Sequence, residues 1–414
     1  MNIKSLRSMK TKTLKKGKIN LQKILDKIYH KLKGRYGEAK NADYIPILKN
    51  MDPNIFQISI YPVKNNSYGF ENKIHSVGDF IDEEENKIEV SIQSVSKVFN
   101  LALAIKVRNK KNNYNNRKGL DDLLEYIGTE ESFMGFNDLK AQKMLNGKQG
   151  VPFTINPFIN AGAIATVSFI TPTKTKSTYQ QMIDNINSFS GHKRERHFIS
   201  LATFESEMKW IKHNKSLAKY LKKVSEKYYN KNKNIKKIKY FQGNKDTLDV
   251  NSSLTNYTSI CSMLVNAKEL VDMTYTLANK GVNSKGEKIL SCLENKYILS
   301  ALIFGGMYNA SGQWFQKLGI PMKSGVGGAI IGIIPGEMAI SVISPPLDSY
   351  GNSFLGGKVM EELANELRFH ANGFCKYQKL KIPKKPRKTM KLKSVDLNKE
   401  KKLKHLELII NEKM

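Results

Sequence analysis

Strand-like segments lie near both ends of this chain, on either side of a long helical middle. Ile55–Val63 (IFQISIYPV) has the alternation of a strand, and short apolar runs separated by glycines return over Gly319–Ser344. Between them, from Ser94 to about Leu277, apolar residues recur mainly at helical spacing. Strands so far apart pair only if the fold brings the two ends together. The pattern therefore predicts a mixed sheet with an inserted helical subdomain.

Further helices are predicted at the edges of this core. Leu21–Gly37 has apolar residues at helical spacing and ends in glycine, and Gly357–His370 is predicted to form a closing helix. Loops rich in Asn and Lys are predicted to interrupt the helical middle at 109–118 and at 228–245.

The chain is long enough for one large core or two coupled ones, with 414 residues of which 40% are hydrophobic. Its longest nearly apolar stretch, Gly327–Ser344, is broken by Pro335 and Glu337. We therefore expect a buried hairpin there, not a membrane span.

The net charge of +31 is concentrated in a few segments. Residues 1–23, 105–119, 222–245 and 376–414 together carry about +32, so the rest of the chain is near neutral. A fold built around phosphates would carry its basic stripe on the folded domain. The distribution favours a solvated, compositionally biased surface, and contact of the basic tails with nucleic acid or anionic membrane is the alternative.

Cysteines and histidines give no metal or disulfide pattern. Cys261, Cys292 and Cys375 are too few and too scattered for a disulfide framework, which points to a reducing compartment. The histidines lack metal-ligand spacing, and His213 and His370 are predicted to be surface or packing residues. Without a hydrophobic signal core at the N-terminus we expect a cytoplasmic protein, with organelle import by the basic first 23 residues as the alternative.

A buried amine is predicted beside a serine in SIQSVSKVFN, which begins at Ser91. Ser94 lies at an expected helix start, where free N–H groups and the helix dipole favour an oxyanion, and Lys97 follows one turn later on the same face. Apolar neighbours would disfavour the ammonium form of Lys97 and make it a competent base for the serine hydroxyl.

The pattern S-x-x-K alone is weak in a lysine-rich chain. It also occurs at Ser190/Lys193, Ser206/Lys209 and Ser216/Lys219. Only the copy at Ser94 lies in an apolar helix start. S-x-x-K combined with K-T-G is typical of β-lactamases and penicillin-binding proteins, and a K-S-G is present here at Lys323–Gly325. The glycines after it would let backbone amides approach a reacting carbonyl.

Seven separated motifs make a more specific pattern. They are ADYIPIL (42–48), SIQSVSK (91–97), NPFINAGAI (156–164), FESE (204–207) with Asn214 seven residues later, LTNYTSICS (254–262), GMYNASGQ (306–313) and KSGVGG (323–328). In this order they resemble the serine-dependent glutaminase family, from about residue 20 to 370. The loops around 64–74, 81–88, 108–118 and 223–247 look longer than is typical of it. Glu131-Ser132-Phe133 replaces its usual Pro-Ser-Gly step.

The resemblance implies a fold and a domain organisation. The fold would be α/β (α+β) and similar to serine β-lactamases and DD-peptidases, with an antiparallel sheet flanked by helices and a helical subdomain. The chain would consist of a basic N-terminal extension (1–19), a glutaminase catalytic domain (20–375) and a basic C-terminal tail (376–414).

The resemblance also implies an activity: hydrolysis of L-glutamine to glutamate and ammonia through a γ-glutamyl ester, without metal or cofactor, in a homo-oligomer (dimer or tetramer). The implied roles are Ser94 as nucleophile, Lys97 as its base, Tyr308 as proton shuttle, the N–H groups of Ser94 and Val326 for the oxyanion, Glu207 for the substrate ammonium, Asn160, Asn214 and Tyr257 for the amide and carboxylate ends, and Tyr44 as lining of the site.

Each assignment has a simpler structural alternative. Glu207 could be an exposed helix residue, Tyr257 and Tyr308 core aromatics, and Asn160 a turn residue. Two other functions stay open at this stage: another S-x-x-K serine amidase or acylase of β-lactamase-like fold, and a basic polyanion-binding protein built on a glutaminase-like fold.

Overall fold

The computed structural model describes residues 20–111, 116–132, 135–140, 142–143, 146, 154–191, 199–232 and 239–370. The predicted basic extension (1–19), the predicted basic tail (376–414) and Cys375 lie outside these residues.

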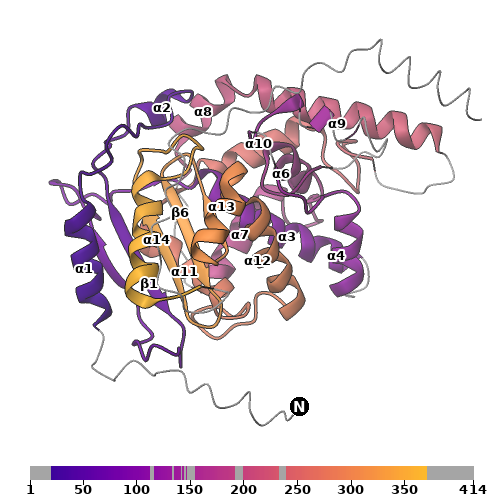
Figure 1. The fold of residues 1–414 in the computed structure, drawn as a ribbon. Helices are drawn as coiled ribbons and strands as arrows, with labels where there is room; N and C mark the ends of the chain where they lie inside the picture. The colour runs from indigo at the N-terminus through magenta and orange to yellow at the C-terminus, as the bar shows by residue number, and fades with distance from the viewer. Residues whose placement is uncertain are drawn as a thin grey trace, which may run out of the picture. The chain divides into compact units, whose positions relative to one another are not determined.

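A five-stranded sheet joins the two ends of the described chain, as the sequence pattern predicts (Figure 1). Its order is β2-β1-β7-β6-β5, with strands β1 (Gln57–Pro62), β2 (His75–Gly78), β5 (Met322–Ser324), β6 (Ala329–Ile334) and β7 (Met338–Ile343). Every neighbouring pair is antiparallel, so the prediction of a mixed sheet is wrong. No helix lies between β1 and β2 or between the strands from β5 to β7, so these connections contain none of the crossovers that parallel neighbours need.

The apolar stretch Gly327–Ser344 forms the predicted hairpin. β6 and β7 pair along their whole length, and all their residues are buried. Gly336, with φ +80°, lies in the turn between the two strands. None of the helices in the described residues combines the length and the apolar character that crossing a bilayer requires.

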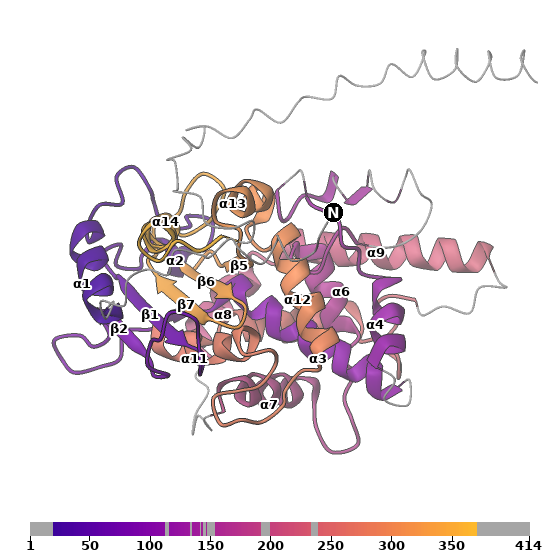
Figure 2. The same cartoon turned by 60° about the horizontal axis from the view of Figure 1, so that its bottom comes forward.

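Helices cover both faces of the sheet (Figure 2). α11 (Ala267–Ala278) packs against β1, β6 and β7 on one face, and α1 (Leu21–Leu32) and α14 (Phe354–Leu367) lie together on the other. The first predicted helix is confirmed as α1. The closing helix begins three residues before its predicted start, because the Ser353 side chain accepts the N–H of Gly356 and caps it.

The predicted helical middle is confirmed within the described residues. It consists of α3 (Ser96–Lys111), α4 (Asn116–Leu124), α6 (Asn160–Ser168), α7 (Thr178–Ser190), α8 (Leu201–Lys209), α9 (Lys212–Lys231) and α10 (Val250–Cys261), with α12 (Cys292–Gly305) and α13 (Ser311–Leu318) following α11. The short elements are α2 (Pro46–Lys49), β3 (Val90–Ser91), β4 (Leu264–Val265) and the 3₁₀ turns η2 (Gln93–Val95) and η3 (Tyr308–Ala310). α3 lies at the centre and packs against α4, α6, α7 and α12.

Three helices extend into the predicted Asn/Lys loops. α3 continues to Lys111, α4 begins at Asn116, and α9 continues to Lys231. Lysine is a good helix former, and α9 has one apolar face that buries Leu217, Leu221 and Tyr229. The loop predictions at 109–118 and 228–245 are therefore too long by these residues.

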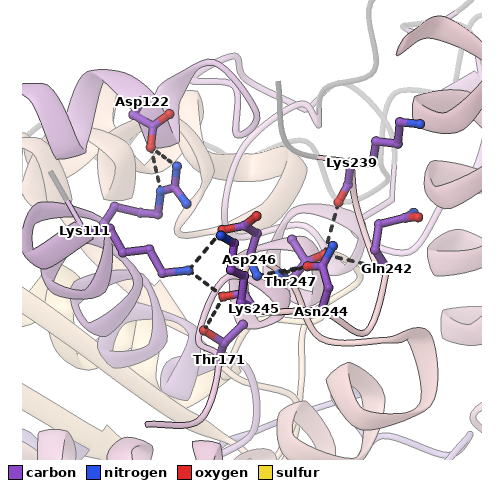
Figure 3. A network of polar contacts seen from close by, with 10 residues as sticks. Lys111, Asp122, Thr171, Lys239, Gln242, Asn244, Lys245, Asp246 and Thr247 are labelled. Carbon is purple, nitrogen blue, oxygen red and sulfur yellow. Dashed lines mark hydrogen bonds and ion pairs between the residues drawn. The ribbon is translucent and has the colours of Figure 1, made fainter. Parts of the chain in front are cut away.

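The turn at 244–247 is tied to the end of α3 (Figure 3). The Lys111 ammonium donates to the carbonyl of Lys245 at 2.9 Å and lies 3.7 Å from the Asp246 carboxylate. The Asn244 side chain accepts the N–H groups of Asp246 and Thr247 at 2.9 and 3.1 Å. The described end of this long loop thus supports the helix that follows Ser94.

Candidate functional site

Ser94 lies at the junction of the sheet and the helical part. It belongs to η2, which contacts β5, β6 and α10 and leads directly into α3 at Ser96. The prediction of a helix start near Ser94 is confirmed, with a 3₁₀ turn as its first turn. Gln93, the preceding residue, has φ +49°, a left-handed conformation that is costly for a side-chain-bearing residue and is often found at functional sites.

Lys97 is almost entirely buried, with 1% of its surface exposed. Its Nζ donates to the carbonyl of Phe158 at 3.0 Å and to Oδ1 of Asn160 at 2.7 Å. Burial lowers the pKa of Lys97 to about 8, against the opposing influence of negative charge on Cys261 and Glu207. The amine can therefore be neutral near physiological pH. No hydrogen bond joins it directly to Ser94 within the described part of the chain.

Tyr308 lies next to Ser94. Its hydroxyl donates to the carbonyl of Ser324 at 3.0 Å, and the Ser94 side chain lies close enough to lower the pKa of this hydroxyl. The Phe136 ring packs against its ring with centroids 4.7 Å apart. Burial raises the pKa of Tyr308 well above its usual range, so the hydroxyl keeps its proton in the resting site.

Asn160 connects Lys97 to two other predicted residues. Its Oδ1, which accepts from Lys97, also lies 3.4 Å from the Tyr257 hydroxyl, and its Nδ2 donates to Oδ1 of Asn214 at 2.9 Å. Asn160 is the first residue of α6, whereas Tyr257 belongs to α10 and Asn214 to α9. Three helices therefore meet at one amide side chain.

Glu207, on α8, is held by a residue that the sequence analysis does not identify. Gln93 donates to Oε1 of Glu207 at 2.6 Å and to the Ser91 hydroxyl at 3.1 Å. Desolvation by the surrounding protein raises the pKa of Glu207 to about 7, although the Gln93 hydrogen bond and the charge of Lys97 favour the carboxylate. Gln93 stands one residue before Ser94, and nothing in its type or spacing distinguishes it from a surface residue.

Glycines bring the backbone after β5 against Ser94. A Cβ on Gly325 would lie 3.3 Å from the backbone nitrogen of Ser94, and one on Gly327 would lie 2.4 Å from the carbonyl oxygen of Ser91. Only glycine permits so close an approach. Val326, between them, is 5% exposed, and its N–H is used in no backbone pairing among the described residues. The turn that carries Val326 therefore packs against the backbone of Ser94.

Tyr44 lies at the rim of this group. It exposes 46% of its surface, but its hydroxyl is surrounded by protein, which raises its pKa, and nearby negative charge on Tyr308 or Glu207 would raise it further. The fold therefore brings every predicted site residue into one region. We call this group the Ser94 cluster: Tyr44, Ser94, Lys97, Asn160, Glu207, Asn214, Tyr257, Tyr308 and Val326.

The Ser94 cluster contains the kinds of group that acyl transfer requires. Such a reaction needs a nucleophile, a base, a proton donor and an oxyanion site, and the cluster has a hydroxyl next to a helix start, a buried amine, a second hydroxyl and backbone N–H groups on two segments in close contact. Within the described ranges, no group of three or more His, Cys, Asp or Glu residues is placed to hold a metal ion. His213 is exposed and hydrogen-bonds the carbonyl of Asn137, and His370 hydrogen-bonds that of Gln316, in agreement with their predicted surface or packing role.

Two large cavities lie elsewhere in the fold. One of about 560 Å³ is lined by residues of α12 and the β6–β7 turn, and one of about 630 Å³ lies between α3, α7 and the loop before α7. Neither is lined by a residue of the Ser94 cluster. The geometry of the cluster, not the size of a cavity, identifies the site.

Known proteins similar to this chain have one activity in common. The glutaminase family model matches residues 39–371. A glutaminase from Colwellia psychrerythraea is 32% identical over 355 residues, covering 86% of this chain and 97% of its own, and one from Aliarcobacter butzleri is 34% identical over 344 residues, covering 83% and 96%.

Solved structures agree with this family. The probable glutaminase ybaS has a TM-score of 0.68 at 28% identity and covers 84% of this chain and 97% of its own. A probable glutaminase from Bacillus subtilis complexed with 6-diazo-5-oxo-L-norleucine has the same fold, with a TM-score of 0.64 at 22% identity, covering 84% and 96%. The neighbours have a β-lactamase-like fold, so the predicted fold class is confirmed.

Proposed function

The chain belongs to the glutaminase family, and on that premise we propose that it hydrolyses L-glutamine to L-glutamate and ammonia through an ester formed on Ser94. The observation that carries the proposal is the burial of Lys97 beside the turn of Ser94, with a pKa of about 8. A solvated lysine would be fully protonated at neutral pH and could not act as a base.

Acylation begins at the Ser94 hydroxyl. Its Oγ attacks the side-chain carbonyl carbon of glutamine while its proton passes to the neutral amine of Lys97. The amine points at Asn160 in the resting site, so it turns from the Asn160 amide toward Ser94 for this transfer. The new oxyanion accepts hydrogen bonds from the N–H groups of Ser94 and Val326.

Tyr308 completes acylation by protonating the departing nitrogen. Its hydroxyl gives its proton to the nitrogen as the C–N bond breaks, ammonia leaves, and a γ-glutamyl ester remains on Ser94. The proton that Lys97 took from Ser94 is the one that restores the tyrosine hydroxyl, so acylation leaves no proton unaccounted for. Water then attacks the ester, with Lys97 again as base, and releases glutamate and the serine hydroxyl.

The polar residues around this centre are suited to a free amino acid. Glu207 as a carboxylate pairs with the α-ammonium of the substrate, and binding of that cation lowers its pKa from about 7. Asn160, Asn214 and Tyr257 supply N–H and O–H donors for the amide and carboxylate ends, and Tyr44 lines the entrance.

The proposal is tested by measuring ammonia and glutamate release from L-glutamine by purified protein. Ser94→Ala and Lys97→Ala should each lower kcat on the order of 10³-fold or more. Ser216→Ala is the matched control, since Ser216 and Lys219 form another S-x-x-K on α9 and the substitution should leave activity unchanged. Equal rates for wild type and Ser94→Ala would contradict the mechanism.

We further propose that the protein assembles as a homo-oligomer, a dimer or a tetramer, as members of this family commonly do. Light scattering on the full chain as it elutes from a size-exclusion column measures the mass of the assembly directly. A monomeric mass at micromolar concentration in a fully active sample would contradict this.

A further inference from the structure

A second lysine lies fully buried next to the Ser94 cluster and has no role in the mechanism above. Lys323, on β5, has 0% of its surface exposed. Its Nζ donates to the carbonyl of Ser324 at 2.6 Å and to that of Gly306 at 3.1 Å, and lies 4.4 Å from the centroid of the Tyr308 ring. In the described part of the chain it forms no ion pair with a carboxylate.

The environment disfavours the charged form of Lys323. A buried ammonium without a carboxylate partner is costly, so burial lowers the pKa of Lys323 far below its usual range, and positive charge on Lys97 lowers it further. In its neutral form this amine has two N–H donors, and the carbonyls of Ser324 and Gly306 occupy both. The hydrogen bonds of Lys323 are thus those of a structural residue, and the proposed mechanism does not use it for proton transfer.

Both carbonyls that accept hydrogen bonds from Lys323 lie in segments that hold Tyr308 in place. Ser324 O also accepts the Tyr308 hydroxyl at 3.0 Å, and Gly306 stands two residues before Tyr308. A Cβ on Gly306 would lie 1.8 Å from the carbonyl oxygen of Met322, so this segment is packed tightly against β5. Tyr308 itself has φ +56°, a conformation that persists only where its surroundings hold it.

We propose that Lys323 is a positioning residue for Tyr308, holding the carbonyl of Ser324 and the turn at Gly306 so that the tyrosine hydroxyl can switch between Ser324 and the departing nitrogen. The inference rests on the proposed function. When Tyr308 turns to the nitrogen, it breaks its hydrogen bond to Ser324 O. That buried carbonyl stays paired because Lys323 still donates to it, whereas without Lys323 it would be left without a partner.

The test compares two substrates that differ in their need for Tyr308. Lys323→Met keeps a long side chain and removes the donors. We expect kcat on L-glutamine to fall by about 10- to 100-fold with KM changed less than about threefold, because the loss affects the step that protonates nitrogen. On a p-nitrophenyl γ-ester of L-glutamate, whose leaving group needs no proton, the rate should stay within about threefold of wild type.

A double-mutant cycle separates positioning of Tyr308 from general loosening of the site. Tyr308→Phe removes the hydroxyl, and adding Lys323→Met to it should lower kcat on glutamine by less than about twofold. Lys317→Met is the matched control: Lys317 is another buried lysine, paired with Glu361 on α14, and its loss should not distinguish the two substrates.

Three outcomes would overturn the inference. Lys323→Met could have the kinetics of wild type, or it could lose the same factor in kcat on both substrates. In the double variant, the losses in kcat from Lys323→Met and Tyr308→Phe could multiply as if the two residues acted independently. Thermal unfolding measurements show whether each variant is folded. If Lys323→Met does not fold, Lys323→Gln, which keeps two N–H donors without charge, should show the same selectivity with a smaller loss. A wild-type protein inactive on glutamine would overturn the proposed function and this inference together.

Discussion

Lys97 and Glu207 are ionisable groups of opposite sign whose charged forms are both disfavoured by burial. Desolvation lowers the pKa of Lys97 to about 8 and raises that of Glu207 to about 7, and each charge partly offsets the penalty on the other. The proposed reaction needs a neutral amine and a carboxylate. Both forms are favoured by raising the pH through this range.

The pH dependence of kcat/KM therefore follows from these two groups. Below about pH 8 the neutral fraction of Lys97 falls tenfold per pH unit, and below about pH 7 the carboxylate of Glu207 is lost as well, so the logarithmic slope should steepen from about one to about two. Glu207→Gln should lower kcat/KM and return the acidic slope to about one. Glu205→Gln, an exposed residue on the same helix, should keep the wild-type profile. A flat wild-type profile between pH 6 and 8 would exclude Lys97 as the base.

At the scale of residues, the sequence predicts the reacting groups better than the residues that hold them in position. A lysine one turn after a serine in an apolar helix start predicts a buried amine, and Lys97 is buried. The other site residues were identified only through the resemblance, because single Tyr, Asn and Glu residues have many structural roles. Gln93 and Lys323 were missed as supporting residues. Their importance depends on contacts with Glu207 and Tyr308. Glu207 lies far from Gln93 in the chain, and helix α13 lies between Tyr308 and Lys323.

At the scale of elements, the site depends on how closely the turn between β5 and β6 approaches η2. The sequence predicted the strands and the glycine turn from alternation and glycine content. The strand pattern alone favours a mixed sheet, whereas the resemblance implies the antiparallel sheet that is found. Neither predicts that β1 lies beside β7, because pairing between distant strands depends on tertiary contacts. Nor did the pattern give the ends of α3 and α9, where packing of an apolar face extends helices into Lys-rich sequence.

Gly327→Ala tests this approach. The new Cβ would lie 2.4 Å from the carbonyl oxygen of Ser91 in β3 and 3.2 Å from Cγ of Gln93 in η2, so the turn must move away from both elements. We expect kcat to fall by at least about tenfold through misplacement of the oxyanion donors, with a stability loss of about 1–3 kcal/mol. Kinetics and thermal unfolding measure the two effects.

The matched control is Gly336→Ala in the turn between β6 and β7. Gly336 has φ +80° with no atom within 4 Å of an added Cβ, so the substitution should cost about 1–2 kcal/mol of stability through backbone strain and leave kcat unchanged. A Gly327→Ala enzyme with wild-type kcat would show that this close approach does not matter for catalysis.

At the scale of the whole molecule, charge and chemistry are separated along the chain. The net charge of +31 comes almost entirely from four segments, two of them at the ends, whereas the Ser94 cluster is built from near-neutral sequence. We therefore expect the basic ends to have no required part in the proposed reaction.

Deletion of residues 376–414 should therefore leave kcat/KM for glutamine within about threefold of the full chain. The measurement is ammonia release by the truncated and full-length proteins at equal concentration of active sites. Loss of most activity in a truncated protein that remains folded would show that the tail is part of the enzyme.

The most direct measurement of the central claim is covalent trapping of the nucleophile. A diazoketone analogue of glutamine, such as 6-diazo-5-oxo-L-norleucine, is incubated with the full chain, and the adduct is mapped by peptide mass spectrometry, with Ser94→Ala as the control. The account predicts one adduct per chain, on Ser94, absent from the Ser94→Ala protein. An adduct on any other residue, or an equal yield in the Ser94→Ala protein, would contradict it.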